Sequence, residues 1–208
     1  MASTDSKRDR LIEALSGDVR LMTHHQLARL LESDAEQTEN LVAELLADKL
    51  IAIESHLASI PEEGGPALCW SPGDSPPDFG NLAYQFRKRV REASECEVIL
   101  PTAKLCKVYG GTRVRPRASE WSHDVRLANA YLSYRDDLHG SRELSWTSGD
   151  TLRSDGETHH FPSRVPDAIL RKGDGTPVKV IEAAGSGYSR SKLTRLHASY
   201  SSHPYELW

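Results

Sequence analysis

The sequence predicts a mixed α/β protein in two parts, on three observations. Apolar residues first recur at helical spacing and then alternate from about Leu50, and a Pro- and Gly-rich stretch at 71–80 interrupts both patterns. Beyond that stretch, three strand-like segments are followed by a helical segment and a short strand. We therefore expect an N-terminal domain over residues 1–72, a linker over 73–80 and an α/β domain over 81–208.

The N-terminal domain is expected to contain three helices and a hairpin. Leu11 lies on the apolar face of the first helix, and Thr23 and Asp34 are suitable N-caps for the second and third. The alternating segment 50–55 and the later segment "ALCWSP" are predicted to pair with each other. Three helices followed by a two-stranded hairpin is the plan of a winged helix-turn-helix domain.

The C-terminal domain is expected to begin with helices at about Asn81–Ala93 and Ser122–Asp136. The segments "RELSWTS", "VPDAILRK" and "VKVIEAA" then read as strands. The turn "GDG" at 173–175 predicts a hairpin of the last two. A helix capped by Ser189 or Ser191 and a final strand "PYELW" complete the order.

Charge is unevenly distributed along the 208 residues. The formal net charge of −4 divides into −9 over residues 1–80 and +5 over residues 81–208. The overall acidity therefore does not exclude a nucleic-acid partner, but it places any anion-binding surface in the second part. The sequence has no apolar run long enough to span a membrane, so no membrane partner is expected, and neither a secretory signal nor a disulfide or zinc pattern is recognised. These features predict a cytoplasmic protein.

Two acidic residues are the candidates for chemistry. If the predicted hairpin forms, Asp167 in "VPDAIL" and Glu182 in "KVIEAA" lie on adjacent strands. Paired carboxylates bind Mg²⁺, which activates water and stabilises charge on a phosphate. The other interpretation makes Asp167 a turn residue after a proline. Glu182 interrupts an apolar run, and a buried carboxylate costs several kcal/mol unless it is paired or metal-bound.

The order of helix, strand, strand with "PD", strand with Glu and helix resembles the PD-(D/E)XK nuclease-like superfamily. More closely, the chain resembles the replication-relaxation family of plasmid and mobile-element proteins, in which a winged helix precedes a degenerate nuclease-like domain. The matching stretches cover most of residues 120–200 and are "HDVRLANAYL", "LSWTSGDTLR", "VPDAIL" and "VIEAAGSGYSRSKLTRLHASY". The resemblance implies a nuclease-like mixed sheet. It also implies a DNA-associated role in plasmid or mobile-element replication or mobilisation, by binding DNA or scaffolding a complex.

The resemblance also implies roles for single residues. Asp167 matches the acid of the "PD" element and Glu182 the acid of the third strand, so both are candidate catalytic and metal-binding residues. Ala184 stands where the superfamily tends to have a lysine, so little or no nuclease activity is expected. Lys192 on the next helix is either a relocated catalytic lysine or a surface residue. His123 matches the histidine that opens the first core helix, and it either faces the site or packs that helix.

Three functions therefore remain open. The first is DNA binding or scaffolding without cleavage, with no cofactor. The second is a Mg²⁺-dependent DNA endonuclease that uses Asp167, Glu182 and Lys192. The third is a protein-interaction or dimerisation module, or a transcriptional regulator. The sequence lacks the glycine patterns of nucleotide-binding loops and of the nucleophile elbow, so neither of those sites is expected.

DNA contact is expected outside the winged helix. The third helix, "DAEQTENLVAELLADKL", is acidic and would be repelled by phosphates, so it is expected to face a partner protein, a second copy of the chain, or the C-terminal domain. Residues 81–117 hold nine basic residues against three acidic ones, and the Gly/Ser turn before Arg190 is a second candidate anion site. The alternative for the basic segment is a solvated face paired to the acidic domain. The candidate nucleic-acid-binding residues are Arg87, Lys88, Arg89, Arg113, Arg115, Arg117 and Arg190.

Overall fold

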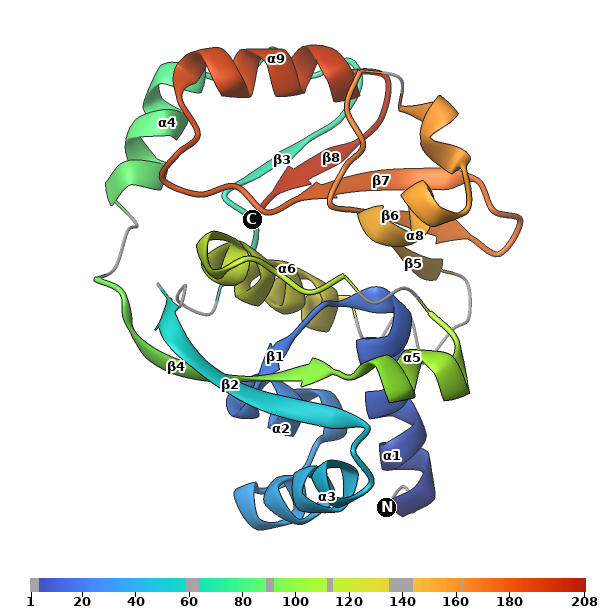
Figure 1. Cartoon of the computed structure of the whole chain (residues 1–208). Helices are drawn as coiled ribbons and strands as arrows, with labels where there is room; N and C mark the ends of the chain where they lie inside the picture. Colours follow the sequence, from blue (N-terminus) through green and yellow to red (C-terminus); the bar gives the residue numbers. More distant parts are fainter. Residues whose placement is uncertain (1–3, 59–63, 89–91, 112–113, 135–143, 162) are drawn as a thin grey trace. The chain divides into compact units, whose positions relative to one another are not determined.

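The computed structural model describes residues 4–58, 64–88, 92–111, 114–134, 144–161 and 163–208. In these residues the chain is a mixed α/β protein with eight α-helices and two β-sheets (Figure 1). None of the described helices is long and apolar enough to cross a membrane. The chain divides into two compact units. Unit 1 is Met1–Ile60 with Ala93–Arg135, and unit 2 is Pro61–Glu92 with Asp136–Trp208.

Unit 1 holds the N-terminal helices and the three-stranded sheet. Its described elements are α1 (Thr4–Glu13), a π-helical turn (Ala14–Asp18), β1 (Met22–Thr23), α2 (His24–Leu31), α3 (Ala35–Ala47), β2 (Ile51–Ala58), β4 (Ser94–Pro101), α5 (Ala103–Tyr109), a 3-10 turn (Ala118–Glu120) and α6 (Trp121–Ser133). Both predicted N-caps are confirmed. The Thr23 hydroxyl accepts the Gln26 N–H, and the Asp34 carboxylate accepts the Gln37 N–H.

The sheet of unit 1 corrects the predicted hairpin. Its strand order is β1-β4-β2, with antiparallel pairing throughout, and β2 pairs with β4 from Ile51 opposite Pro101 to Ala58 opposite Ser94. The pairing of segment 50–55 with "ALCWSP" was therefore wrong. The alternating apolar residues of β4 are buried against Leu21 and α6, so the long β4 offers β2 a partner that the short "ALCWSP" strand cannot match.

Helix α6 also belongs to unit 1. The buried Gln26 of α2 donates from its Nε2 atom to the Val125 carbonyl and to Asn129 Oδ1 of α6, both over 2.7 Å. The expectation that helix 122–136 opens the C-terminal domain is corrected by this packing. A buried amide needs partners, and α6 supplies them to α2.

Unit 2 holds the five-stranded sheet. Its described elements are β3 (Leu68–Trp70), α4 (Phe79–Lys88), β5 (Leu144–Ser148), α8 (Gly149–Ser154), a 3-10 turn (Glu157–His160), β6 (Ala168–Lys172), β7 (Pro177–Glu182), α9 (Arg190–Tyr200) and β8 (Tyr205–Leu207). The strand order is β3-β8-β7-β6-β5. The predicted hairpin of β6 and β7 is confirmed, with Gly175 at a φ of 84° in its turn, and α9 connects β7 to the parallel strand β8.

Helices α4 and α9 pack together over one face of this sheet (Figure 1). Leu82 and Phe86 of α4 share a buried cluster with Leu193 and Leu196 of α9. The expected linker at 73–80 lies inside unit 2, between β3 and the first residues of α4. The chain instead leaves unit 1 after β2 and returns to it before β4. The segment between these two paired strands supplies β3 and α4 of unit 2.

Candidate functional site

The structure places Asp167 and Glu182 at neighbouring strand ends. Asp167 immediately precedes β6, and Glu182 is the last residue of β7. Ala168 lies opposite Ile181 in the ladder, so the next position along each strand brings the two acidic residues side by side. The predicted pair of carboxylates is therefore brought together by the hairpin.

Backbone groups hold Asp167 in position. Its Oδ2 atom accepts the Ala183 N–H over 2.9 Å, and its carbonyl accepts the Gly149 N–H over 2.7 Å. A Cβ atom on Gly149 would collide with the carbonyl oxygen of Pro166, so this close approach requires glycine. Gly149 thus fixes the segment that carries Asp167.

Glu182 is completely buried and is surrounded by hydrogen-bond donors. Its Oε1 atom accepts the Tyr188 hydroxyl over 2.7 Å and a hydrogen bond from Arg164 Nη2, and its Oε2 atom accepts the Tyr200 hydroxyl over 3.2 Å. Sequence reasoning missed these three partners. The available signal was the cost of a buried carboxylate, which requires donors from elsewhere in the chain.

The donors of Glu182 connect both ends of α9 to the end of β7. Tyr188 directly precedes the N-cap Ser189, whereas Tyr200 is the last residue of the helix. One buried carboxylate therefore anchors the start and the finish of α9 on the sheet. Lys192, in the first turn of α9, places its Nζ atom 3.6 Å from the centroid of the Tyr188 ring.

The electrostatics of this cluster reflect burial and mutual charge. Burial, and next the Asp167 carboxylate, raise the pKa of Glu182 to about 7 against the opposing effect of Arg164 and Tyr188. Burial and the Arg164 charge together lower the pKa of Lys192. Burial opposes the charge of Arg164, but Glu182, Tyr188 and Tyr200 together more than offset it, so the pKa of the guanidinium is raised. Each shift indicates that these groups interact closely.

The residues around the two acids do not fit a Mg²⁺ ion. Mg²⁺ is held by carboxylate oxygens that are free to coordinate it, and it keeps several waters. Both Glu182 oxygens instead accept protein hydrogen bonds, one Asp167 oxygen accepts the Ala183 N–H, and a guanidinium already pairs with Glu182. In the described part of the chain, no group of three or more His, Cys, Asp or Glu residues is arranged to hold a metal ion.

His123 belongs to unit 1, whereas the carboxylate cluster belongs to unit 2. The histidine lies on α6 of unit 1, and its Nδ1 atom is 2.9 Å from Oδ1 of the neighbouring Asp124. This interaction lies within α6 itself.

The candidate nucleic-acid-binding residues fall into three groups. Arg87 and Lys88 are exposed in the last turn of α4, and Arg190 is exposed at the start of α9. Arg115 pairs with Glu54 over 2.8 Å, although its own side chain stays largely exposed. Arg117 is also exposed in unit 1, whereas Arg89 and Arg113 lie outside the described residues.

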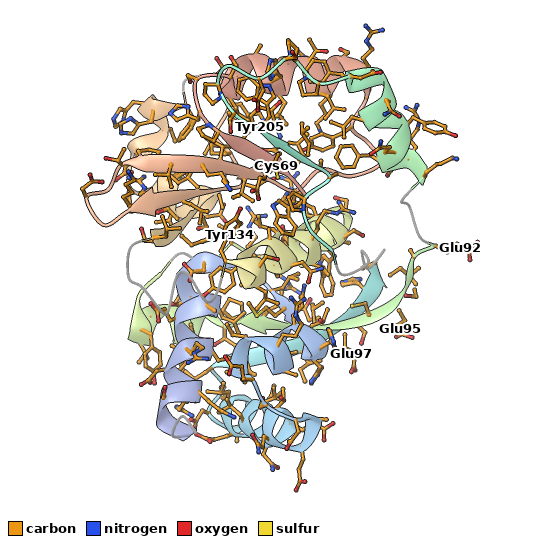
Figure 2. The ribbon with its side chains drawn as sticks, turned by 180° about the vertical axis from the view of Figure 1, so that it is seen from behind. Cys69, Glu92, Glu95, Glu97, Tyr134 and Tyr205 are labelled. Atoms are coloured by element: carbon orange, nitrogen blue, oxygen red, sulfur yellow. The ribbon has the colours of Figure 1, made fainter. Side chains whose placement is uncertain are left out.

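The basic segment 81–117 is divided between the two units. Its α4 part belongs to unit 2, whereas β4 and α5 belong to unit 1. Figure 2 shows Glu95 and Glu97 projecting outward from β4, where they dilute the positive charge of the segment. The surface of unit 2 is therefore the better candidate for phosphate contact.

Comparisons with known proteins found no match. No protein-family model, curated protein or solved structure matches the chain.

Proposed function

We propose that the chain is a DNA-associated protein that binds DNA through unit 2 and cleaves it little or not at all. The observation that carries this proposal is a basic surface on the packed helices α4 and α9. Neither helix contains an Asp or Glu, and the segment 183–205 contains none either. We call this the α4–α9 surface, and its described basic residues are Arg87, Lys88, Arg190, Lys192 and Arg195.

The two helices hold these side chains on a fixed base. The Phe86 ring packs against Tyr188 with the ring centroids 6.3 Å apart, and Phe79 packs against His197 at 5.4 Å. Arginine side chains on a rigid base match phosphate oxygens with their two-pronged donors. This geometry supports backbone contact with little sequence preference, because nothing in it requires a base edge.

The fold of unit 1 supports a winged helix as the second part of the proposal. A sheet of order β1-β4-β2, with α2 and α3 between β1 and β2, is the arrangement expected of that domain. Its α3 remains acidic, and Arg8 of α1 pairs with both Glu44 and Asp48. We therefore propose that α3 faces a partner protein or a second copy of the chain rather than DNA. A role in replication or mobilisation of a plasmid or mobile element is the setting that the family resemblance implies.

The proposal is tested by fluorescence anisotropy on a labelled DNA duplex across a salt series. Arg190→Gln with Arg195→Gln should lower affinity at about 50 mM salt on the order of tenfold and reduce the salt slope by about one for each phosphate that is no longer neutralised. The matched control is Lys172→Gln, an exposed lysine at the end of β6 in the same unit. Equal affinity of the double variant and the parent chain contradicts the proposal.

The endonuclease remains a second candidate because Asp167 and Glu182 do lie side by side. Its test is nicking of supercoiled plasmid with Mg²⁺ or Mn²⁺ by the parent chain and by Asp167→Asn. We expect no nicking that depends on Asp167, since both oxygens of Glu182 already accept hydrogen bonds from protein donors. Cleavage by the parent that disappears in Asp167→Asn would favour the endonuclease instead.

A further inference from the structure

The Arg164 guanidinium enters the carboxylate site between the two strand ends and α9. Its Nη2 atom donates to Glu182 Oε1 and lies 3.3 Å from the Tyr188 hydroxyl. Its Nε atom is buried and finds no acceptor in the described part of the chain. A buried donor without an acceptor costs free energy, so the attraction of Glu182 must hold the side chain there.

We infer that Arg164 takes the place of a divalent cation at the Asp167–Glu182 pair, and that the chain carries a latent metal site which this arginine closes. Two adjacent carboxylates require a positive charge, which a metal ion supplies in a catalytic site. Here the guanidinium supplies it from within the chain. The inference concerns the carboxylate pair and not the α4–α9 surface, so it does not depend on DNA binding.

The surroundings of Arg164 explain why removing it should open the site. Its side chain is 37% exposed, whereas that of Glu182 is 0% exposed, so Arg164 is the member of this ion pair that solvent reaches. A shorter neutral side chain at position 164 leaves Glu182 with two tyrosine donors and no counter-charge. A hydrated cation can then reach the pair from solvent and replace the missing charge.

The test is Mn²⁺ binding, followed by the decrease of the free-ion electron paramagnetic resonance signal and by calorimetry. The parent chain should take up no Mn²⁺ at this site. Arg164→Ala should bind a single Mn²⁺ at least on the order of tenfold more tightly than any residual Mn²⁺ binding by the parent chain elsewhere on its surface. The further change Glu182→Gln should abolish that binding, because it removes the ligand charge.

Two matched variants separate this effect from general loosening of unit 2. Arg164→Lys keeps a cation and should gain no Mn²⁺ binding. Arg171→Gln removes another partly buried arginine, the partner of Glu157 in the same unit, and should gain none either. Circular dichroism verifies that each variant folds, and Arg164→Gln replaces Arg164→Ala if the latter does not.

Two outcomes overturn the inference. The first is that the parent chain binds Mn²⁺ and that Glu182→Gln abolishes this binding, because the site is then open with Arg164 in place. The second is a folded Arg164→Ala or Arg164→Gln chain that binds Mn²⁺ no better than the parent. Neither outcome bears on the DNA-binding proposal, which fails only if neutralising the α4–α9 surface leaves the DNA affinity unchanged.

Discussion

The Tyr188 hydroxyl donates to Oε1 of Glu182 over 2.7 Å, and this bond joins the segment before α9 to the end of β7. Because Glu182 is completely buried, water cannot replace a donor that is removed. Glu182, which the sequence predicts to be a metal ligand, therefore stabilises the fold. It keeps the basic helix at a fixed position on the sheet.

Removing that hydroxyl should destabilise the chain. We expect Tyr188→Phe to lower the free energy of unfolding by about 0.5–1.5 kcal/mol, the range for one hydrogen bond, because Arg164 still donates to the same carboxylate oxygen. Tyr200→Phe should cost more, about 1–3 kcal/mol, because Tyr200 is the one donor to the buried Oε2 atom among the described residues. Urea unfolding followed by circular dichroism measures both.

Tyr84→Phe is the matched control for these variants. Tyr84 lies on α4 in the same unit and is 49% exposed, so removal of its hydroxyl should change the free energy of unfolding by less than about 0.5 kcal/mol. If Tyr188→Phe is equally neutral, Glu182 does not depend on this donor.

Gly149→Ala should also destabilise the chain, because the new methyl group would overlap the Pro166 carbonyl beside Asp167. Overpacking of this kind costs about 1–3 kcal/mol. Gly187→Ala is the control, since a Cβ atom there meets open space. Thermal unfolding of the two variants compares them, and equal melting temperatures would contradict the close approach at Gly149.

Local sequence patterns predicted individual helices and strands better than they predicted which strands pair with each other. The Thr23 and Asp34 caps and the β6–β7 hairpin depend on interactions within a few residues, and the structure confirms all three. The pairing of β2 with β4 joins strands separated by more than thirty residues, and a period-two pattern does not say which strand is the partner.

The candidate site could likewise be predicted from the sequence only where a short-range interaction determines it. The hairpin placed Asp167 beside Glu182 because its turn fixes the register. The donors Arg164, Tyr188 and Tyr200 come from a loop and from the two ends of a helix, so only the three-dimensional packing reveals them.

Asp18 makes the stability of unit 1 dependent on pH. Asp18 is partly exposed, but packed protein atoms surround most of it. This burial raises its pKa from 3.8 to about 7, against the opposing hydrogen bond with Tyr131. The folded chain therefore holds a proton that the unfolded chain releases near pH 4. The stability that this proton contributes is complete below about pH 4 and is lost as pH rises through 7.

Asp18→Asn imitates the protonated side chain and should remove this pH dependence. We expect the variant to be more stable than the parent chain at pH 8, by an amount on the order of a few kcal/mol, with the difference shrinking toward pH 5. Urea unfolding at both pH values measures it. A difference that grows toward low pH would show that the folded-state pKa of Asp18 is lowered instead.

The acidic face of α3 should weaken DNA binding by the whole chain. Glu36 and Glu39 are exposed on this helix, and like charge repels phosphates at low salt. We expect Glu36→Gln with Glu39→Gln to raise DNA affinity about twofold at about 50 mM salt and to have little effect at high salt, where the charges are screened. Asn40→Asp, an added carboxylate at an exposed position of the same helix, should act in the opposite direction. Anisotropy titrations at the two salt concentrations measure all three chains. A fall in affinity after the glutamates are neutralised would mean that α3 contacts DNA directly, because repulsion alone can only be relieved by removing negative charge.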